Sequence, residues 1–213
     1  MESTTGAKSG VLRLLVHERL IVRFVSLLVL GGLLFTASWY VAYAWLPEGV
    51  LRGRTAIPSG LLEETSTTVF REWLRIVGYN ATVPVILIIV ANFFTLFQVY
   101  PLGYVPPLVN IILYGLVLGT NSFAIPMPER MAPSLAVLER SGPYEFAGMF
   151  MVAAATYSLS RVRVTDAGNV PAAIAAILRS LHREQWIGLA LGIGIILLAG
   201  WREAAMIVAR GGG

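Results

Sequence analysis

The sequence contains no cysteine, and Lys8 is the only lysine among its 16 basic residues. Without cysteine the chain has no disulfide bond, no thiolate nucleophile and no cysteine metal site. Charged residues are scarce as well, since they make up 13% of the 213 residues, against about 25% in an ordinary soluble domain. Such a composition leaves too few polar groups to cover a surface in water and favours a lipid bilayer as the solvent.

Sequence motifs of catalysis and cofactor binding are also missing. We find no phosphate-binding glycine loop, no nucleophile elbow and no recognisable Ser/His/Asp arrangement. The two histidines, His17 and His182, stand apart from each other in no metal-ligand spacing. The net charge of +4 is dispersed along the chain, which argues against a nucleic-acid partner. The chain is therefore predicted to be no enzyme and to bind no metal or cofactor.

Long uncharged runs are what the sequence does have. Residues 24–46 carry no charge, and as a helix this run reaches about 35 Å, enough to cross the hydrocarbon of a bilayer. Further apolar runs cover residues 76–100, 108–125, 142–159 and 186–201. Together they predict an all-α fold, a polytopic transmembrane helical bundle of about five spans.

Amphipathic segments are expected beside these spans. Residues 1–23 form a basic amphipathic N-terminal segment, in which Arg13, Arg19 and Arg23 are interleaved with apolar residues. Residues 62–77 and 171–183 have the periodicity of amphipathic helices. The first of them is expected to lie on the membrane surface or to pack over the bundle. Residues 24–210 then constitute the transmembrane helical domain, and residues 211–213 a flexible glycine tail.

Counting basic residues alone gives no orientation, because five spans divide lysine and arginine evenly between the two sides. The basic residues before the first span crowd its N-terminal flank, whereas the arginines of the first long loop are balanced by glutamates. The aromatic residues at 39–45 are typical of an interfacial belt rather than of a cleaved signal peptide. We therefore predict a multi-pass protein of the cell membrane with a cytoplasmic N-terminus.

Pairs of glycines recur at a spacing of four residues. Gly115 and Gly119 form a GxxxG pair in the third span, and Gly188 and Gly192 form another in the fifth. This spacing lets two helix backbones approach closely in lipid. Packing between helices of one chain is one interpretation, and homo-oligomerisation is the other.

Glu145 is the only acidic residue inside a predicted span, where an ionised carboxylate is costly unless it is paired or hydrated. Ser141, Gly142 and Pro143 indicate a helix start just before it, and a helix N-terminus favours a carboxylate. The alternative is a polar binding site that Glu145 shares with intramembrane asparagines. These asparagines, which otherwise bridge helices through their amides, are Asn80, Asn92 and Asn121.

Two short motifs carry a family resemblance. Residues 76–80 read Ile-Val-Gly-Tyr-Asn at the entrance of a span, and residues 141–148 read Ser-Gly-Pro-Tyr-Glu-Phe-Ala-Gly at a helix start. Residues 75–163 thereby resemble the stage II sporulation protein M family of membrane proteins, in which a later helix opens with His-Gly-x-x-Glu. Gly142 and Glu145 match that pattern, whereas Ser141 replaces the histidine. The resemblance implies a small multispan protein that, in spore-forming bacteria, scaffolds cell-wall-degrading partners.

Three classes of function are compatible with these features. The one we favour is a noncatalytic membrane scaffold or assembly protein, which binds protein partners in the bilayer through its amphipathic helices and the Glu145 region. The second is a transporter or channel subunit with a polar intramembrane site around Glu145. An intramembrane enzyme is a weaker third class, because it requires a second catalytic group facing Glu145.

Overall fold

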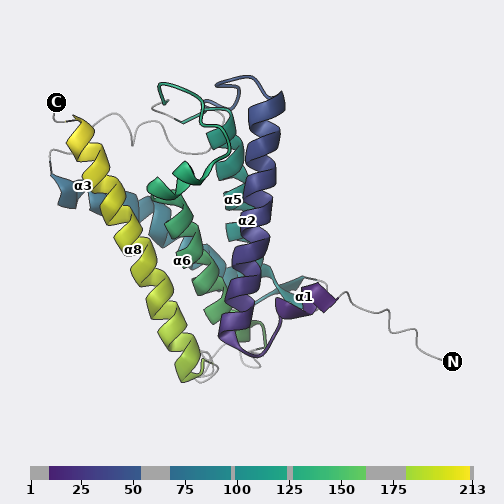
Figure 1. Ribbon diagram of the computed structural model, residues 1–213. Helices are drawn as coiled ribbons and strands as arrows, with labels where there is room; N and C mark the ends of the chain where they lie inside the picture. Colours follow the sequence, from purple (N-terminus) through teal and green to yellow (C-terminus); the bar gives the residue numbers. More distant parts are fainter. Residues whose placement is uncertain (1–9, 54–67, 97–98, 124–126, 162–180, 212–213) are drawn as a thin grey trace.

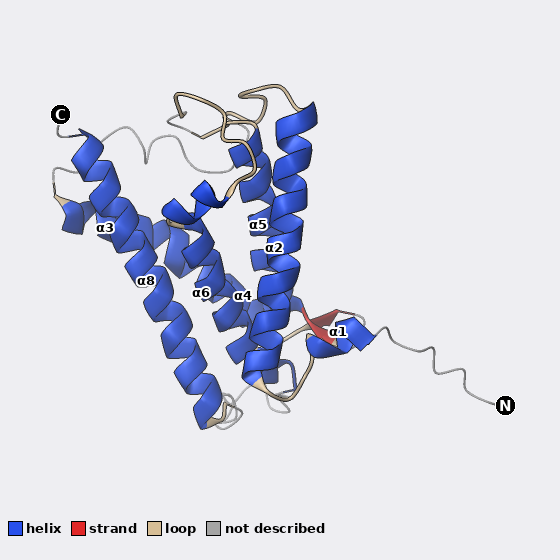
Figure 2. Ribbon diagram, viewed as in Figure 1, coloured by secondary structure: helices blue, strands red, loops and turns tan. Residues whose placement is uncertain are grey.

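The computed structural model describes residues 10–53, 68–96, 99–123, 127–161 and 181–211, which are mainly helical (Figures 1 and 2). The α-helices are α1 (Gly10–Leu14), α2 (Leu20–Trp45), α3 (Val69–Ile76), α4 (Val83–Ala91), α5 (Val105–Gly119), α6 (Gly142–Ala155) and α8 (Arg183–Gly211). A π-helical segment η2 (Val77–Thr82) joins α3 to α4, and the 3-10 turns are η3 (Leu102–Tyr104), η4 (Leu135–Glu139) and η5 (Tyr157–Arg161). A short antiparallel hairpin pairs β1 (Thr95–Leu96) with β2 (Tyr100–Pro101).

Three helical segments of the described chain are long and apolar enough to cross a membrane. They are Leu20–Trp45, Leu102–Gly119 and Arg183–Ala209. These segments overlap the first, third and last expected spans, so the helical class is confirmed. The expected second span is instead divided by η2 and ends at the hairpin, and α6 has only 14 residues. The expected number of about five spans therefore stays a prediction.

Both glycine pairs lie where helices of this chain meet. Helix α5 runs parallel to α2, and a Cβ atom at Gly119 would lie 2.6 Å from the Trp39 carbonyl oxygen. Helix α8 runs antiparallel to α6, and a Cβ atom at Gly192 would lie 2.8 Å from the Gly148 carbonyl oxygen. Gly115 faces α2 in the same way, next to Ser38. Any side chain at these positions would push the two backbones apart.

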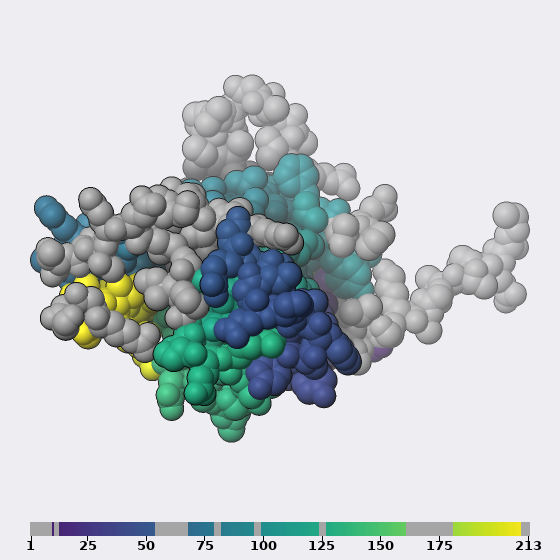
Figure 3. Space-filling model, turned by 90° about the horizontal axis from the view of Figure 1, so that it is seen from above, coloured from purple at the N-terminus to yellow at the C-terminus, as the bar shows by residue number. Residues whose placement is uncertain are grey.

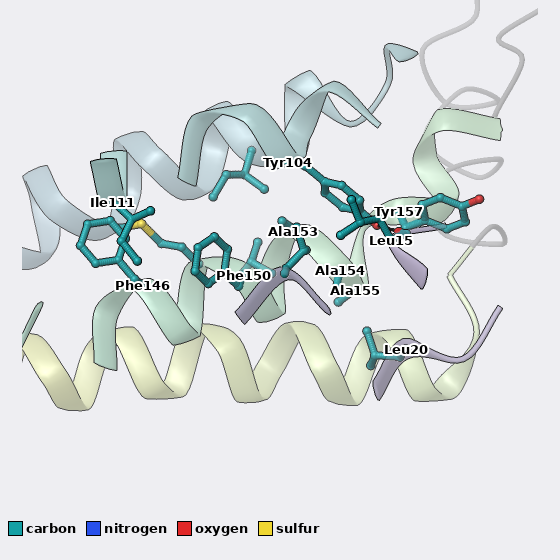
Figure 4. Close-up of a cluster of buried hydrophobic side chains, with 14 of the residues drawn as sticks. Leu15, Leu20, Tyr104, Ile111, Phe146, Phe150, Ala153, Ala154, Ala155 and Tyr157 are labelled. Atoms are coloured by element: carbon teal, nitrogen blue, oxygen red, sulfur yellow. Dashed lines mark hydrogen bonds between the residues drawn. The ribbon is translucent and has the colours of Figure 1, made fainter. Parts of the chain in front are cut away.

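Helix α6 lies at the centre of the bundle, between α2 and α8 (Figure 1). Val152 and the run from Ala153 to Ala155 are fully buried, and so is Phe150, whose ring fits against Gly31 of α2. Figure 4 shows this core, where aromatic and aliphatic side chains from several helices surround the alanines of α6. Because α6 is apolar on most of its surface and has neighbours on several sides, it is buried without being long.

The N-terminal boundary differs from the expected one. Helix α2 begins at Leu20, and Arg23, which was expected on the membrane surface, is only 1% exposed. Backbone carbonyls inside the bundle solvate this guanidinium, whereas the expected division into residues 1–23 and 24–210 stays a prediction.

The amphipathic helix expected at residues 62–77, on the membrane surface or over the bundle, is described from Val69 onwards as α3. Glu72 in α3 is fully buried, and the indole Nε1 of Trp73 donates to the Leu197 carbonyl of α8 at 3.0 Å. Helix α3 thus packs against the bundle. Residues 62–67 and nearly all of the amphipathic helix expected at 171–183 lie outside the described residues.

Candidate functional site: a carboxyl pair at the start of α6

The start of α6 follows from its local sequence. Pro143 stands in the first turn, where its fixed φ suits a helix and its missing N–H is not needed, and the Glu145 N–H bonds to the Ser141 carbonyl at 3.2 Å. Gly142 is required by close packing, because a Cβ atom there would lie 2.6 Å from the ring Cζ of Tyr114 in α5. The expected helix start at Ser141–Gly142 is where the structure begins α6.

Glu145 faces a second carboxyl group. The side chain of Glu145 is 9% exposed, and its carboxyl group is in hydrogen-bonding contact with that of Glu203 in α8. Two carboxyl groups form such a bond only when one of them carries a proton, which then lies between the two oxygens. Within the described part of the chain, the Oε1 atom of Glu145 has no hydrogen-bond partner. The structure therefore places two carboxyl groups side by side, and Glu145 Oε1 remains a buried acceptor without a bond among the described residues.

Other polar groups surround the pair from neighbouring elements. The Ser141 side chain contacts the Glu203 carboxyl group, and the positive charge of Arg140 attracts that carboxyl group electrostatically. Helix α3 contributes Glu72, which is buried and ion-paired with Arg75 one turn later. Elements far apart in the sequence thus place several charged groups around one end of α6.

Two of the expected site residues lie elsewhere. Asn92, at the end of α4, is fully buried and donates from Nδ2 to the Ala153 carbonyl at 3.1 Å and to the Thr156 hydroxyl at 2.6 Å. It therefore ties α4 to the C-terminal end of α6, the opposite end from Glu145. The side chain of Asn80 lies outside the described residues.

Asn121 organises a loop beyond α5. Its backbone has a φ of +50°, a left-handed conformation that asparagine adopts more readily than most residues. Its amide donates to the Glu48 carboxylate at 2.7 Å and to the Met127 carbonyl at 2.9 Å, and its Oδ1 accepts from the Met127 N–H at 2.8 Å. Of the expected polar site, the structure brings together Ser141, Gly142 and Glu145, and it adds Glu203.

Two arginines that sequence reasoning did not single out bind helix C-termini. Arg23 donates to the Ala154 carbonyl in the last turn of α6 and to the carbonyls of His17 and Glu18, and it lies over the Tyr157 ring. A cation at this end of a helix also interacts favourably with the helix dipole. Helical periodicity could have signalled Arg23, because it follows Leu20 by three residues on the face that α2 buries.

Arg130 plays the same part at the other end of the bundle. Its guanidinium donates to carbonyls in the last turns of both α2 and α5, among them Ala42 at 3.1 Å and Gly119 at 2.8 Å. Figure 3 shows this end, where the blue segment after α2 lies against the green segment that contains Arg130. No periodic signal marks a loop arginine of this kind.

A metal site needs several carboxylate or imidazole ligands close together. Within the described ranges, no three side chains of histidine, aspartate or glutamate come together as metal ligands. The carboxyl pair offers two such groups.

The described residues define a mainly helical protein with three helical segments apolar enough to cross a membrane and with a carboxyl pair between α6 and α8. No family model matches the chain, and no curated protein or solved structure is significantly similar to it. The positions and contacts of the described residues are therefore the main guide to its function.

Proposed function

We propose that this chain is a noncatalytic, multi-pass protein of the cell membrane that acts as a scaffold for partner proteins, with its N-terminus in the cytoplasm. The resemblance of residues 75–163 to the stage II sporulation protein M family agrees with such a role. The proposal includes five passes through the bilayer, in alternating direction.

Two further passes are proposed between the three long apolar helices. Helices α3 and α4 join through η2 into one helical stretch from Val69 to Ala91, which reaches about 34 Å. Helix α6 reaches only about 21 Å, but its neighbours enclose it, so that it needs little contact with lipid.

One observation carries the scaffold proposal: two buried polar side chains of the bundle and the half-buried Arg130 bond to the chain's own backbone. Arg23 and Asn92 bind carbonyls at the end of α6, and Arg130 binds carbonyls of α2 and α5. A carrier or channel would instead line a path with such groups. Their use as internal bonds supports a rigid body that presents its outer faces to partners.

A transporter remains the second candidate, because of the carboxyl pair. A buried glutamate oxygen with no partner, beside a second carboxyl group, is what a proton relay requires. This function predicts proton flux into liposomes that contain the purified chain, and loss of that flux in Glu145→Gln.

The scaffold function is tested by capture of partners from native membranes in mild detergent. A partner that is recovered with the tagged chain, and that recovers this chain when tagged itself, is the expected result. Reduced recovery in Glu145→Gln, with Glu129→Gln in an exposed loop as the matched control, would locate docking near the carboxyl pair. Unchanged recovery would make a docking role for Glu145 wrong, and proton flux without any reciprocal partner would replace the scaffold by the transporter.

A further inference from the structure

An open apolar groove lies between the first turns of α2 and α8. Leu20 and Ile21 form one wall, Ile187 and Leu191 form the other, and Met151 of α6 closes the floor. Ile21, Ile187 and Leu191 are each about half exposed, at 56%, 49% and 55%. Figure 4 shows Leu20 beside α8, where it covers Gly188. Gly188 thus lets the Leu20 side chain pack directly against α8 at the side of the groove.

The contents of this groove follow from its position, and this step rests on the proposed membrane insertion. Both walls belong to helices apolar enough to cross a bilayer. From Arg183 to Leu191 the groove runs about 12 Å along α8, which is most of the roughly 15 Å hydrocarbon depth of one leaflet. A water molecule would lose hydrogen bonds in this apolar groove, because the lining offers it almost no polar partners. A hydrocarbon chain has no polar group to desolvate and can fill the groove without that loss.

The mouth of the groove is suited to an anion. Arg183 is exposed there, and Arg19, also exposed, directly precedes α2. Of the acidic residues near the mouth, Glu184 already accepts a hydrogen bond from the Leu20 N–H at 2.9 Å, and the exposed Glu18 directly precedes Arg19. Both α2 and α8 begin at this mouth, so that the positive ends of two helix dipoles add to the arginine charge.

We propose that this groove binds one anionic phospholipid, with an acyl chain between α2 and α8 and the headgroup phosphate on Arg183. The lipid comes from the leaflet that faces the N-terminus. In the proposed orientation this is the cytoplasmic leaflet, where anionic lipids are concentrated. The bound acyl chain would contact both the α2–α5 part of the bundle and the α6–α8 part.

The test is native mass spectrometry of the purified chain in detergent, supplied with equal amounts of dioleoyl phosphatidylglycerol and dioleoyl phosphatidylcholine. The unmodified chain is expected to retain one phosphatidylglycerol in preference to phosphatidylcholine. Arg183→Gln should lower that retention about fivefold, the value of one basic residue at an anionic surface. The matched control is Arg71→Gln, an exposed arginine on α3, which should retain the lipid as before.

A second variant tests the apolar part. Ile187→Trp fills the groove and should lower retention by about fourfold for each methylene that it displaces. Leu198→Trp places the same side chain on the same helix, at a position that is 72% exposed and outside the groove, and should change nothing.

Equal retention of the two lipids by the unmodified chain would overturn the proposal, and so would retention that neither groove variant reduces. Extraction of native membranes with alkaline carbonate separates this failure from failure of the proposed function. If the chain stays in the membrane but shows no lipid preference, only the lipid site is wrong. If carbonate releases the chain, both the membrane function and the site are wrong.

Discussion

The two ends of α6 use polar side chains in opposite ways. At the C-terminal end, the carbonyls of Ala153 and Ala154 accept bonds from Asn92 and Arg23, side chains of two other helices. At the N-terminal end, Glu145 meets another carboxyl group, and one of its oxygens has no partner. An unpaired buried oxygen occurs at both ends, because Asn92 Oδ1, like Glu145 Oε1, has no hydrogen-bond partner among the described residues. The two ends differ in their donors, and this difference teaches which end is held together: a guanidinium and an amide donate to carbonyls at the C-terminal end, whereas two carboxyl groups lie side by side at the N-terminal end.

The largest effect is expected from Arg23→Leu. Loss of the guanidinium leaves buried carbonyls of α6 and of the segment before α2 unsatisfied, which should lower the free energy of unfolding by about 3 kcal/mol. Titration with sodium dodecyl sulfate in mixed micelles measures it. Arg13→Leu, at an exposed arginine of α1, should change it by less than about 0.5 kcal/mol. Equal effects of the two changes would show that Arg23 does not stabilise the end of α6.

A smaller loss is expected from Asn92→Ala. This change removes two bonds between α4 and α6, and we expect a loss of about 2 kcal/mol in the same titration. Thr156→Val removes only one of those bonds, together with a bond within α6, and should cost about 1 kcal/mol. If Asn92→Ala were neutral, the contrast between the two ends of α6 would not hold.

The smallest effect on stability is expected from Glu145→Gln. The amide keeps the shape of the side chain and can donate to Glu203 without a shared proton, so the free energy of unfolding should stay within about 1 kcal/mol of the original. The infrared carbonyl band of a protonated carboxyl group should disappear in this variant. Persistence of that band would mean that the proton does not lie between Glu145 and Glu203.

The sequence predicted those features that repeat along a helix or mark its end. The apolar runs gave the three long helices, and Ser141, Gly142 and Pro143 gave the start of α6, since these signals are local. Glu203 was missed because it lies two residues beyond the expected last span, which ended at Trp201. Its partnership with Glu145 depends on the antiparallel packing of α6 and α8, about which single-helix periodicity says nothing.

Composition and periodicity by themselves determined that this protein is helical, apolar and poor in catalytic motifs. Only the tertiary structure decided which polar side chains are internal bonds and which form a site. Asn92 and Glu145 are both isolated polar residues in apolar runs. Asn92 donates to a backbone carbonyl and a hydroxyl of another element, whereas Glu145 meets a carboxyl group. The physical reason is that the cost of a buried polar group depends on its partner, and the partner comes from another part of the chain.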